Sequence, residues 1–229
     1  MFNLVRLGFD FATTMALVLG YLFALVIGFT LHEAAHAFVA YKQGDPTPKF
    51  FGRLSLNPAK HIDPLGLVML LLVGFGYAKP VPVNPQNFRH GRLSNFLVSF
   101  AGIFTNIVLA LVFSCLYVVF AFFAPSAIFG SGFFSFLLYA FLQFGIVINL
   151  SLAVFNLIPI PPLDGFRILE SVLGPKARGF LDFMYKYSFV FMLALLVVVM
   201  FVFDFIGEVV YFIERGFLWV FESLFGLLV

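Results

Sequence analysis

The sequence has little charge and almost no cysteine. Only 10% of its 229 residues are Asp, Glu, Lys or Arg, whereas 62% are hydrophobic and 20% are aromatic. So small a charged fraction excludes an ordinary soluble domain and predicts a protein that crosses a membrane several times. The net charge of +2 argues against a nucleic-acid partner. The single cysteine, Cys115, cannot form an internal disulfide, and we interpret it as a packing residue.

Long apolar runs predict an all-α polytopic membrane protein with about five to six transmembrane segments. A spanning helix needs roughly 20 apolar residues. Runs near that length lie at about 11–41, 93–123, 133–155 and 187–203. Residues 205–229 are also apolar but carry four charged side chains, so they are a candidate for an interfacial helix as much as for a span.

The region after the first long run is rich in turn-forming residues. Glycines and prolines recur over 42–63, so the first helix is not expected to continue through it. Residues 50–56 are expected to form a short β-hairpin or strand, because polar and apolar side chains fall on opposite faces there. The apolar run 65–75 is short for a span, and the prolines of 80–85 favour an extended backbone after it.

The basic residues indicate how these segments are ordered across the bilayer. They gather in the connections at about 42–60, 79–92 and 167–186, whereas the loop 124–132 is uncharged. Because short basic loops face the cytoplasm, a full span at 65–75 would place two basic loops on opposite sides. We therefore predict that this run is re-entrant, that the basic connections are cytoplasmic and that the N-terminus is outside.

The segment Leu31–His36 carries a pattern of metal hydrolases. His32 and His36 are four residues apart, so on a helix both imidazoles can reach one ion, with Glu33 beside them. Zinc suits this pattern, because two imidazoles and one further ligand leave a position for water, from which Glu33 can take a proton. Ionisable residues near membrane depth also need a partner, and a metal is an efficient one. The alternative is a solvated helix end at the membrane surface.

Asp164 and Asn106 are two further candidate site residues. Asp164 follows the third long run and the proline-rich segment 159–162, whose irregular backbone is tolerated at membrane depth only where it lines a cavity or water. Asp164 is thus placed where a third ligand is needed, although an Asp-Gly pair is also typical of a surface turn. Asn106, four residues after Gly102, supplies an amide inside the second run or marks a helix-packing notch.

Taken together, these residues resemble the site-2 protease family of intramembrane zinc metallopeptidases, in its compact branch without PDZ or CBS domains. The matching segments, in the family's order, are His32–His36, Gly102–Asn106 and Asn156–Gly165. Residues 53–58 and 78–85 are also similar to that branch. The resemblance covers about residues 17–165.

The resemblance implies a role for each matching residue. It implies that one Zn²⁺ ion is held by His32, His36 and Asp164, and that Glu33 is the catalytic base and later the proton donor to the leaving amine. Asn156 and Asn106 would lie near the cleft, where their amides hold the substrate backbone or stabilise the oxyanion. Residues 49–57 would be a membrane-embedded hairpin that pairs with the substrate as an added strand.

We therefore predict one integral membrane domain, 1–229, with a catalytic core at about 11–165 and C-terminal transmembrane or amphipathic segments at about 187–229. The expected activity is that of a zinc metalloendopeptidase that cleaves membrane-protein substrates within or near their transmembrane segments, as in regulated intramembrane proteolysis. We expect a multi-pass protein of a prokaryotic inner membrane, with its active site toward the cytoplasm. Its expected partners are the lipid bilayer and a transmembrane substrate, with homo-oligomerisation left open.

A membrane metal-ion transporter or channel is the main alternative, in which the same His and Asp residues bind an ion in transit. Against it, Glu33 would have no role, and acidic or His residues do not recur along the other spans to form a path. A proteolytically silent scaffold is disfavoured by the complete set of active residues. His61 and His90 are other potential ligands, but the neighbouring Lys60 and Arg89 favour a solvated face for both.

Overall fold

The computed structural model describes residues 10–73 and 78–226, and every regular element in these ranges is helical. The long helices are α1 (Phe11–Lys42), α4 (Arg92–Phe123), α6 (Phe133–Asn156) and α9 (Ser188–Gly226). The short helices are α2 (Thr47–Phe50), α3 (Pro64–Val73), α5 (Pro125–Phe129), α7 (Asp164–Leu173) and α8 (Arg178–Lys186). Three single 3₁₀ turns are η2 (Pro58–Lys60), η3 (Pro85–Asn87) and η4 (Gly174–Ala177).

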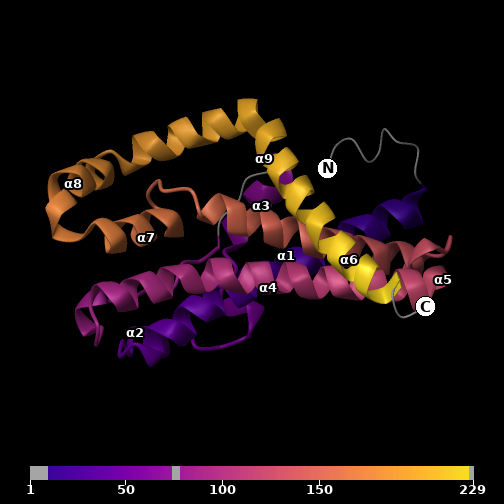
Figure 1. The fold of residues 1–229 in the computed structure, drawn as a ribbon, viewed down its shortest axis with the longest axis horizontal. Coiled ribbons are helices and arrows are strands. Elements are labelled where there is room, and N and C mark those ends of the chain that lie inside the picture. Colours follow the sequence, from indigo (N-terminus) through magenta and orange to yellow (C-terminus); the bar gives the residue numbers. More distant parts are fainter. Residues whose placement is uncertain (1–9, 74–77, 227–229) are drawn as a thin grey trace.

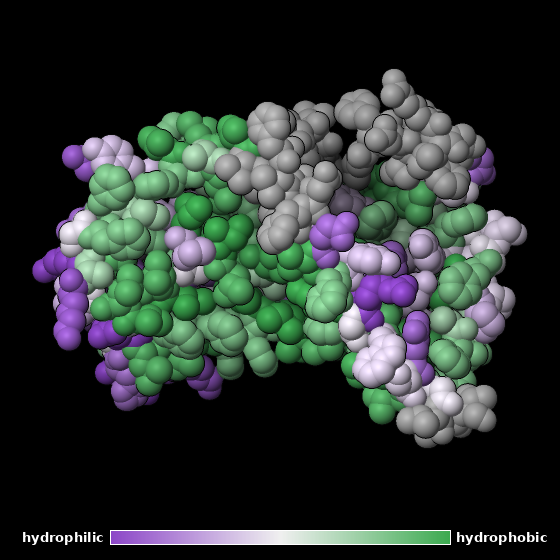
Figure 2. Space-filling view, turned by 45° about the horizontal axis from the view of Figure 1, so that its top comes forward, coloured by the Kyte–Doolittle hydropathy of each residue, from purple (hydrophilic) through white to green (hydrophobic). Residues whose placement is uncertain are grey.

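Helices α1, α4 and α6 pack against one another and form the body of the protein (Figure 1). In the described ranges these three are long and apolar enough to cross a membrane. The helices predicted over 11–41, 93–123 and 133–155 are therefore confirmed, and the protein is a membrane protein. Figure 2 shows apolar side chains over the middle of one face, with hydrophilic residues gathered toward its two ends.

Small residues allow the three helices to approach closely. A Cβ atom at Gly20 of α1 would lie 2.6 Å from the Cβ of Ala140 on α6, and one at Gly145 of α6 would lie 2.5 Å from the ring of Phe113 on α4. Lipid tails are as apolar as the side chains, so helices in a membrane associate mainly through such close packing and through interhelical hydrogen bonds. Asp10 is the N-cap of α1, and its carboxylate accepts a hydrogen bond from the backbone N–H of Thr13 at 3.0 Å.

Within the described residues, the two C-terminal segments expected at 187–203 and 205–229 lie on one helix, α9 (Ser188–Gly226). No proline lies in this stretch, and the single glycine at its centre, Gly207, weakens a helix without ending it. Figure 1 shows that the first and last parts of α9 run in different directions. The five to six spans expected from the sequence stay a prediction.

The hairpin expected over 50–56 is not formed, and this expectation is corrected. Residues 47–50 are the short helix α2, with Pro48 in its first turn, and Gly52 follows with φ +64°. The side chain of Arg53 is buried and donates hydrogen bonds to the backbone carbonyls of Lys60 and Lys79. These local and long-range contacts hold the segment in turns, and alternation of side chains alone could not reveal them.

The ends of the segment 62–78 meet. Ile62 and Ala78 form an isolated antiparallel bridge, and the backbone N–H of Lys79 donates to the carbonyl of His61 at 2.7 Å. Between them α3 has only 10 residues, and 74–77 lie outside the described ranges. The segment 62–78 therefore begins and ends at the same place in the structure.

Asp45 links the C-terminal end of α1 to the residues that follow the segment 62–78. Its buried carboxylate accepts hydrogen bonds from the backbone N–H of Asn84 at 2.7 Å, from Nδ2 of Asn87 at 2.8 Å, and from the N–H and hydroxyl of Thr47. Burial by itself would raise the pKa of Asp45, but the hydrogen bonds from Asn87, Thr47 and Asn84 outweigh it and hold this pKa below its ordinary value.

The expected helical connector at 167–186 consists of α7, η4 and α8, and α7 packs on α4. Arg92, the first residue of α4, reaches the C-terminal end of α7. Its Nε donates to the carbonyl of Ser171 at 2.8 Å and its Nη2 to that of Val172 at 2.7 Å. Carbonyls at a helix end lack partners within the helix, so the guanidinium both satisfies them and holds α7 against α4.

Candidate metal centre

His32 and His36 lie one turn apart on α1, and their Nε2 atoms are 3.0 Å apart. The other nitrogen of each ring faces a hydrogen-bond acceptor. Nδ1 of His36 donates to the backbone carbonyl of Val98 at 2.7 Å, and Nδ1 of His32 donates to Oδ1 of Asn106 at 2.5 Å. Because an imidazole that donates through Nδ1 carries its free lone pair on Nε2 when neutral, both lone pairs point toward each other.

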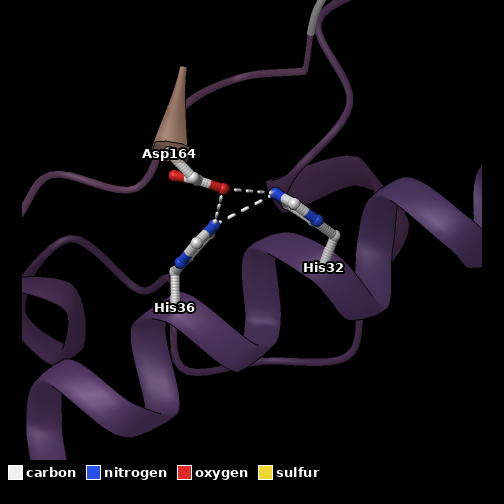
Figure 3. Close-up of side chains that lie close together, drawn as sticks. All are labelled: His32, His36 and Asp164. Carbon is white, nitrogen blue, oxygen red and sulfur yellow. Dashed lines mark hydrogen bonds and ion pairs between the residues drawn. The ribbon is translucent and has the colours of Figure 1, made fainter. Parts of the chain in front are cut away.

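Asp164 completes the cluster from the start of α7 (Figure 3). Its Oδ2 lies 3.3 Å from Nε2 of His32 and 3.1 Å from Nε2 of His36. The three side chains are 132 residues apart in sequence at their extremes, and the proline-rich turn after α6 brings them together. The structure thus places the three residues that the sequence analysis singled out around one point, with their ligand atoms within 4.8 Å of one another.

This arrangement suits a cation. Two imidazole lone pairs and a carboxylate oxygen converge, and Oδ2 of Asp164 is buried without a hydrogen-bond donor among the described residues. Acceptors that face each other in a buried place repel, unless a positive charge lies between them. Two imidazoles and one carboxylate, with an open position, are a ligand set that catalytic zinc takes.

Gly102 on α4 makes room for the cluster. A Cβ atom there would lie 2.5 Å from both Cε1 of His32 and Nε2 of His36. No side chain larger than hydrogen fits without moving an imidazole. The spacing of Gly102 and Asn106 also allowed a helix-packing notch, but the structure places two imidazole rings against Gly102.

Glu33 lies beside the cluster at the edge of a cavity of about 140 Å³. Its Oε2 accepts a hydrogen bond from the backbone N–H of Val81 at 3.1 Å. Val81 belongs to the extended segment 80–83, which lines the cavity with His32 and His36. A polar cavity of this size admits several water molecules.

The two asparagines expected near the cleft differ in position. Asn156, the last residue of α6, lines the cavity and donates through Nδ2 to the carbonyl of Leu152 at 3.0 Å. Asn106 is wholly buried behind His32 and does not line the cavity, and its Nδ2 donates to Oδ1 of Asn149 at 2.7 Å. Contact with substrate is thus open to Asn156, whereas Asn106 faces a metal-ligand candidate.

Several residues of the site were not found from the sequence. Ser99 and Arg167 line the cavity, and Asn149 lies behind Asn106. Asn149 is an uncharged polar residue inside an apolar run, seven positions before Asn156, and this spacing on one helix face could have drawn attention to it. The backbone N–H of Val81 leaves no signal in a sequence.

His61 corrects a further expectation. A solvated position was expected, but His61 is wholly buried, and its Nε2 is 2.7 Å from the carbonyl of Ser55. The surrounding turns cover the ring of His61, and the charges of its sequence neighbours do not indicate this burial. His90 is exposed, as expected. Neither residue belongs to the cluster of His32, His36 and Asp164.

Comparisons with known proteins agree with this chemistry. Residues 20–199 match the model of a family described as Peptidase family M50. The chain is 44% identical over 175 residues to YwhC of Bacillus subtilis (strain 168), covering 76% of this chain and 78% of that protein. It is 33% identical over 202 residues to Rip2 of Mycolicibacterium smegmatis, covering 81% of this chain and 73% of the relative.

A third relative is the archaeal protein MJ0611 of Methanocaldococcus jannaschii, which is 30% identical over 172 residues, or 71% of this chain and 78% of the relative. All three relatives are named "putative zinc metalloprotease". No solved structure matches this chain.

Proposed function

The chain belongs to peptidase family M50 and is a zinc metalloprotease, and from this premise we propose that it cleaves membrane-protein substrates within or near their transmembrane segments. The observation that carries the proposal is the convergence of His32, His36 and Asp164 around one point, from a helix long and apolar enough to cross a membrane. A peptidase site on such a helix is reached most directly by a substrate that is itself in the membrane.

We assign the roles as follows. Zinc is held by Nε2 of His32 and His36 and by the carboxylate of Asp164, and when bound it supplies a Lewis acid that polarises the scissile carbonyl and lowers the pKa of water. Glu33 takes the proton of the attacking water and delivers it to the leaving amine. Oε2 of Glu33 accepts the N–H of Val81, and the remaining lone pairs of the carboxylate are available to this proton.

The substrate must be unwound before it reaches the site, because the peptide groups of a helix are shielded by their own hydrogen bonds. Residues 49–57, expected to pair with the substrate as an added strand, are helical or turn-forming. The extended segment 80–83 is the one beside Glu33, and we assign it this pairing. Asn156 then contacts the substrate backbone from the end of α6, whereas Asn106 acts on His32.

We propose one integral membrane domain over 1–229 with a catalytic core at about 11–165. Helices α1, α4 and α6 span the bilayer, α9 supplies the C-terminal membrane segments, and the run 65–75 is re-entrant, a proposal supported by the bridge between the flanking residues Ile62 and Ala78. The basic connections support a cytoplasmic position for the site, in a prokaryotic inner membrane.

Cysteine labelling tests this topology. In a Cys115→Ser background, one new cysteine is placed at Lys176 and another at Ser131. In intact cells a reagent that cannot cross the membrane should label the cysteine at position 131 and not the one at 176. The opposite labelling pattern would overturn the proposed orientation.

Replacement of Glu33 by Gln tests the catalytic proposal. The amide cannot take a proton, so cleavage of a reporter transmembrane substrate should fall by about a hundredfold or more, while the purified variant still binds one zinc ion. Glu222→Gln, an exposed change on α9, is the control and should cleave normally. Undiminished cleavage by Glu33→Gln would refute the assignment of the base. Glu33→Gln should also co-purify with uncleaved substrate, so the substrate can be identified from the purified sample. Metal flux that requires His32, His36 and Asp164 but not Glu33 would instead favour a transporter.

A further inference from the structure

A chain of buried side-chain amides runs behind the metal-binding face of α1. It begins at Asn149 on α6, continues through Asn106 on α4 and ends at His32 on α1. Neither asparagine has any exposed surface. This hydrogen-bonded series therefore joins α1, α4 and α6 inside an apolar bundle. An amide left there without a hydrogen-bond partner would cost free energy.

Each link of this chain has one direction. Nδ2 of Asn149 donates to the backbone carbonyl of Gly145 at 2.8 Å, so its Oδ1 is left to face Nδ2 of Asn106 at 2.7 Å. Nδ2 of Asn106 is thereby used as a donor, and its Oδ1 faces Nδ1 of His32. A carbonyl oxygen only accepts, so His32 carries its proton on Nδ1 and its lone pair on Nε2, toward Asp164.

The second imidazole is oriented in a simpler way. Nδ1 of His36 donates to the backbone carbonyl of Val98, which belongs to the regular hydrogen-bonded frame of α4 and cannot rotate. The partner of His32 is instead a side-chain amide that can turn by 180°. A turned Asn106 would present its NH₂ group to Nδ1 of His32, which would favour the tautomer with the proton on Nε2 and no lone pair for a metal.

We propose that Asn149 is a positioning residue, which holds the amide of Asn106 in the orientation that keeps Nε2 of His32 free for zinc. This inference rests on the proposed role of His32 as a ligand. Asn149 is itself held in place, because Gly28 of α1 packs against it so closely that a Cβ at Gly28 would lie 3.2 Å from Oδ1 of Asn149. Gly28 lies one turn before His32, so α1 contacts Asn149 at one end of the hydrogen-bonded series and carries His32 at the other.

A double-mutant cycle tests the proposal. Asn149→Leu is made in the wild-type background and in an Asn106→Asp background, where either carboxylate oxygen accepts from Nδ1 of His32 and no amide can turn the wrong way. Zinc affinity is measured in detergent by competition with a chromophoric chelator, and the visible spectrum of the Co²⁺-substituted protein reports the geometry of the site. These readouts do not depend on proteolysis.

In the wild-type background Asn149→Leu should weaken zinc binding by about ten- to a hundredfold, the range for residues that orient metal ligands, and should change the Co²⁺ spectrum. In the Asn106→Asp background the same change should cost less than about threefold, because the carboxylate needs no second amide to orient it. Equal losses in the two backgrounds would overturn the proposal and assign Asn149 to packing alone. If Asn149→Leu fails to fold, Asn149→Ala is measured in the same cycle.

Two controls separate this inference from its premise. Gln143→Leu removes another amide of α6, which donates to Glu214 rather than toward the metal site, and should leave zinc affinity unchanged. His32→Ala should abolish stoichiometric zinc binding. Zinc retained by His32→Ala would contradict the proposed function itself, whereas zinc lost from His32→Ala but held normally by Asn149→Leu would refute only the role of Asn149.

Discussion

The carboxylate of Glu33 accepts a hydrogen bond from the backbone N–H of Val81, with 3.1 Å between Oε2 and N. This bond joins the proposed catalytic base to the segment 80–83, and both line the same cavity. The Val81 N–H thus competes with the attacking water for a lone pair of the Glu33 carboxylate.

Val81→Pro should raise the cleavage rate. Proline lacks the N–H group, so the Glu33 carboxylate loses a donor that competes with water for its lone pairs. The expected gain is up to about tenfold, the rate equivalent of about 1.4 kcal/mol for one hydrogen bond to a charged group. Initial rates on a reporter substrate measure it. Val81→Ala, which shortens the side chain but keeps the N–H that Glu33 accepts, is the matched control. Equal gains in both variants would speak against a specific effect on Glu33.

Gly102→Ala should weaken zinc binding, because the added methyl group would lie 2.5 Å from both imidazoles and must push one of them out of place. We expect a loss of zinc affinity of about tenfold or more, in line with the 1–3 kcal/mol typical of overpacking. Chelator competition measures it. Gly179→Ala on α8, where a Cβ would meet no atom within 4 Å, should bind zinc normally. Normal affinity in Gly102→Ala would show that the site has more room than the geometry indicates.

Asp45→Asn should lower the melting temperature at pH 7. The pKa of Asp45 is lowered in the folded protein, so its stabilising effect is full above the unfolded value of 3.8 and is lost as pH falls through the folded pKa. We expect a drop of about 3–8 °C at pH 7, from a hydrogen-bonded charge worth roughly 1.5–3 kcal/mol, and a smaller difference near pH 3.

Thermal unfolding in detergent at the two pH values checks this. Asp182→Asn, which changes an exposed carboxylate, should alter the melting temperature little at pH 7. A difference between wild type and Asp45→Asn that grew toward pH 3 would contradict the prediction.

Arg92→Lys should loosen α7, the helix that begins with Asp164. An ammonium group cannot reproduce the planar fork that reaches the carbonyls of Ser171 and Val172 at once. We expect a melting temperature lower by a few degrees, equivalent to about 1 kcal/mol, and a zinc affinity lower by several fold. Arg178→Lys, in an exposed residue lining the neighbouring cavity, should change neither. Unchanged zinc affinity in Arg92→Lys would show that the turn before α7 is enough to place Asp164.

Two expectations drawn from local sequence pattern failed because contacts across the fold decided the outcome. His61 was expected at a solvated face because Lys60 precedes it, yet the turns around Arg53 and Ser55 enclose it. Residues 50–56 were expected to pair as a strand, but the carbonyls that Arg53 reaches lie 7 and 26 residues away. The segments expected at 187–203 and 205–229 lie on one helix within the described residues, since Gly207 between them does not end it.

The sequence by itself determined the three long helices and the pairing of His32 with His36. Both follow from local periodicity, since apolar length sets a span and a spacing of four sets one face of a helix. Only the tertiary structure decided that Asn106 turns to His32 rather than to the cavity, that Asn149 stands behind it, and that Val81 meets Glu33. These contacts join residues 43 to 74 positions apart, and which side-chain atoms meet depends on how neighbouring helices pack.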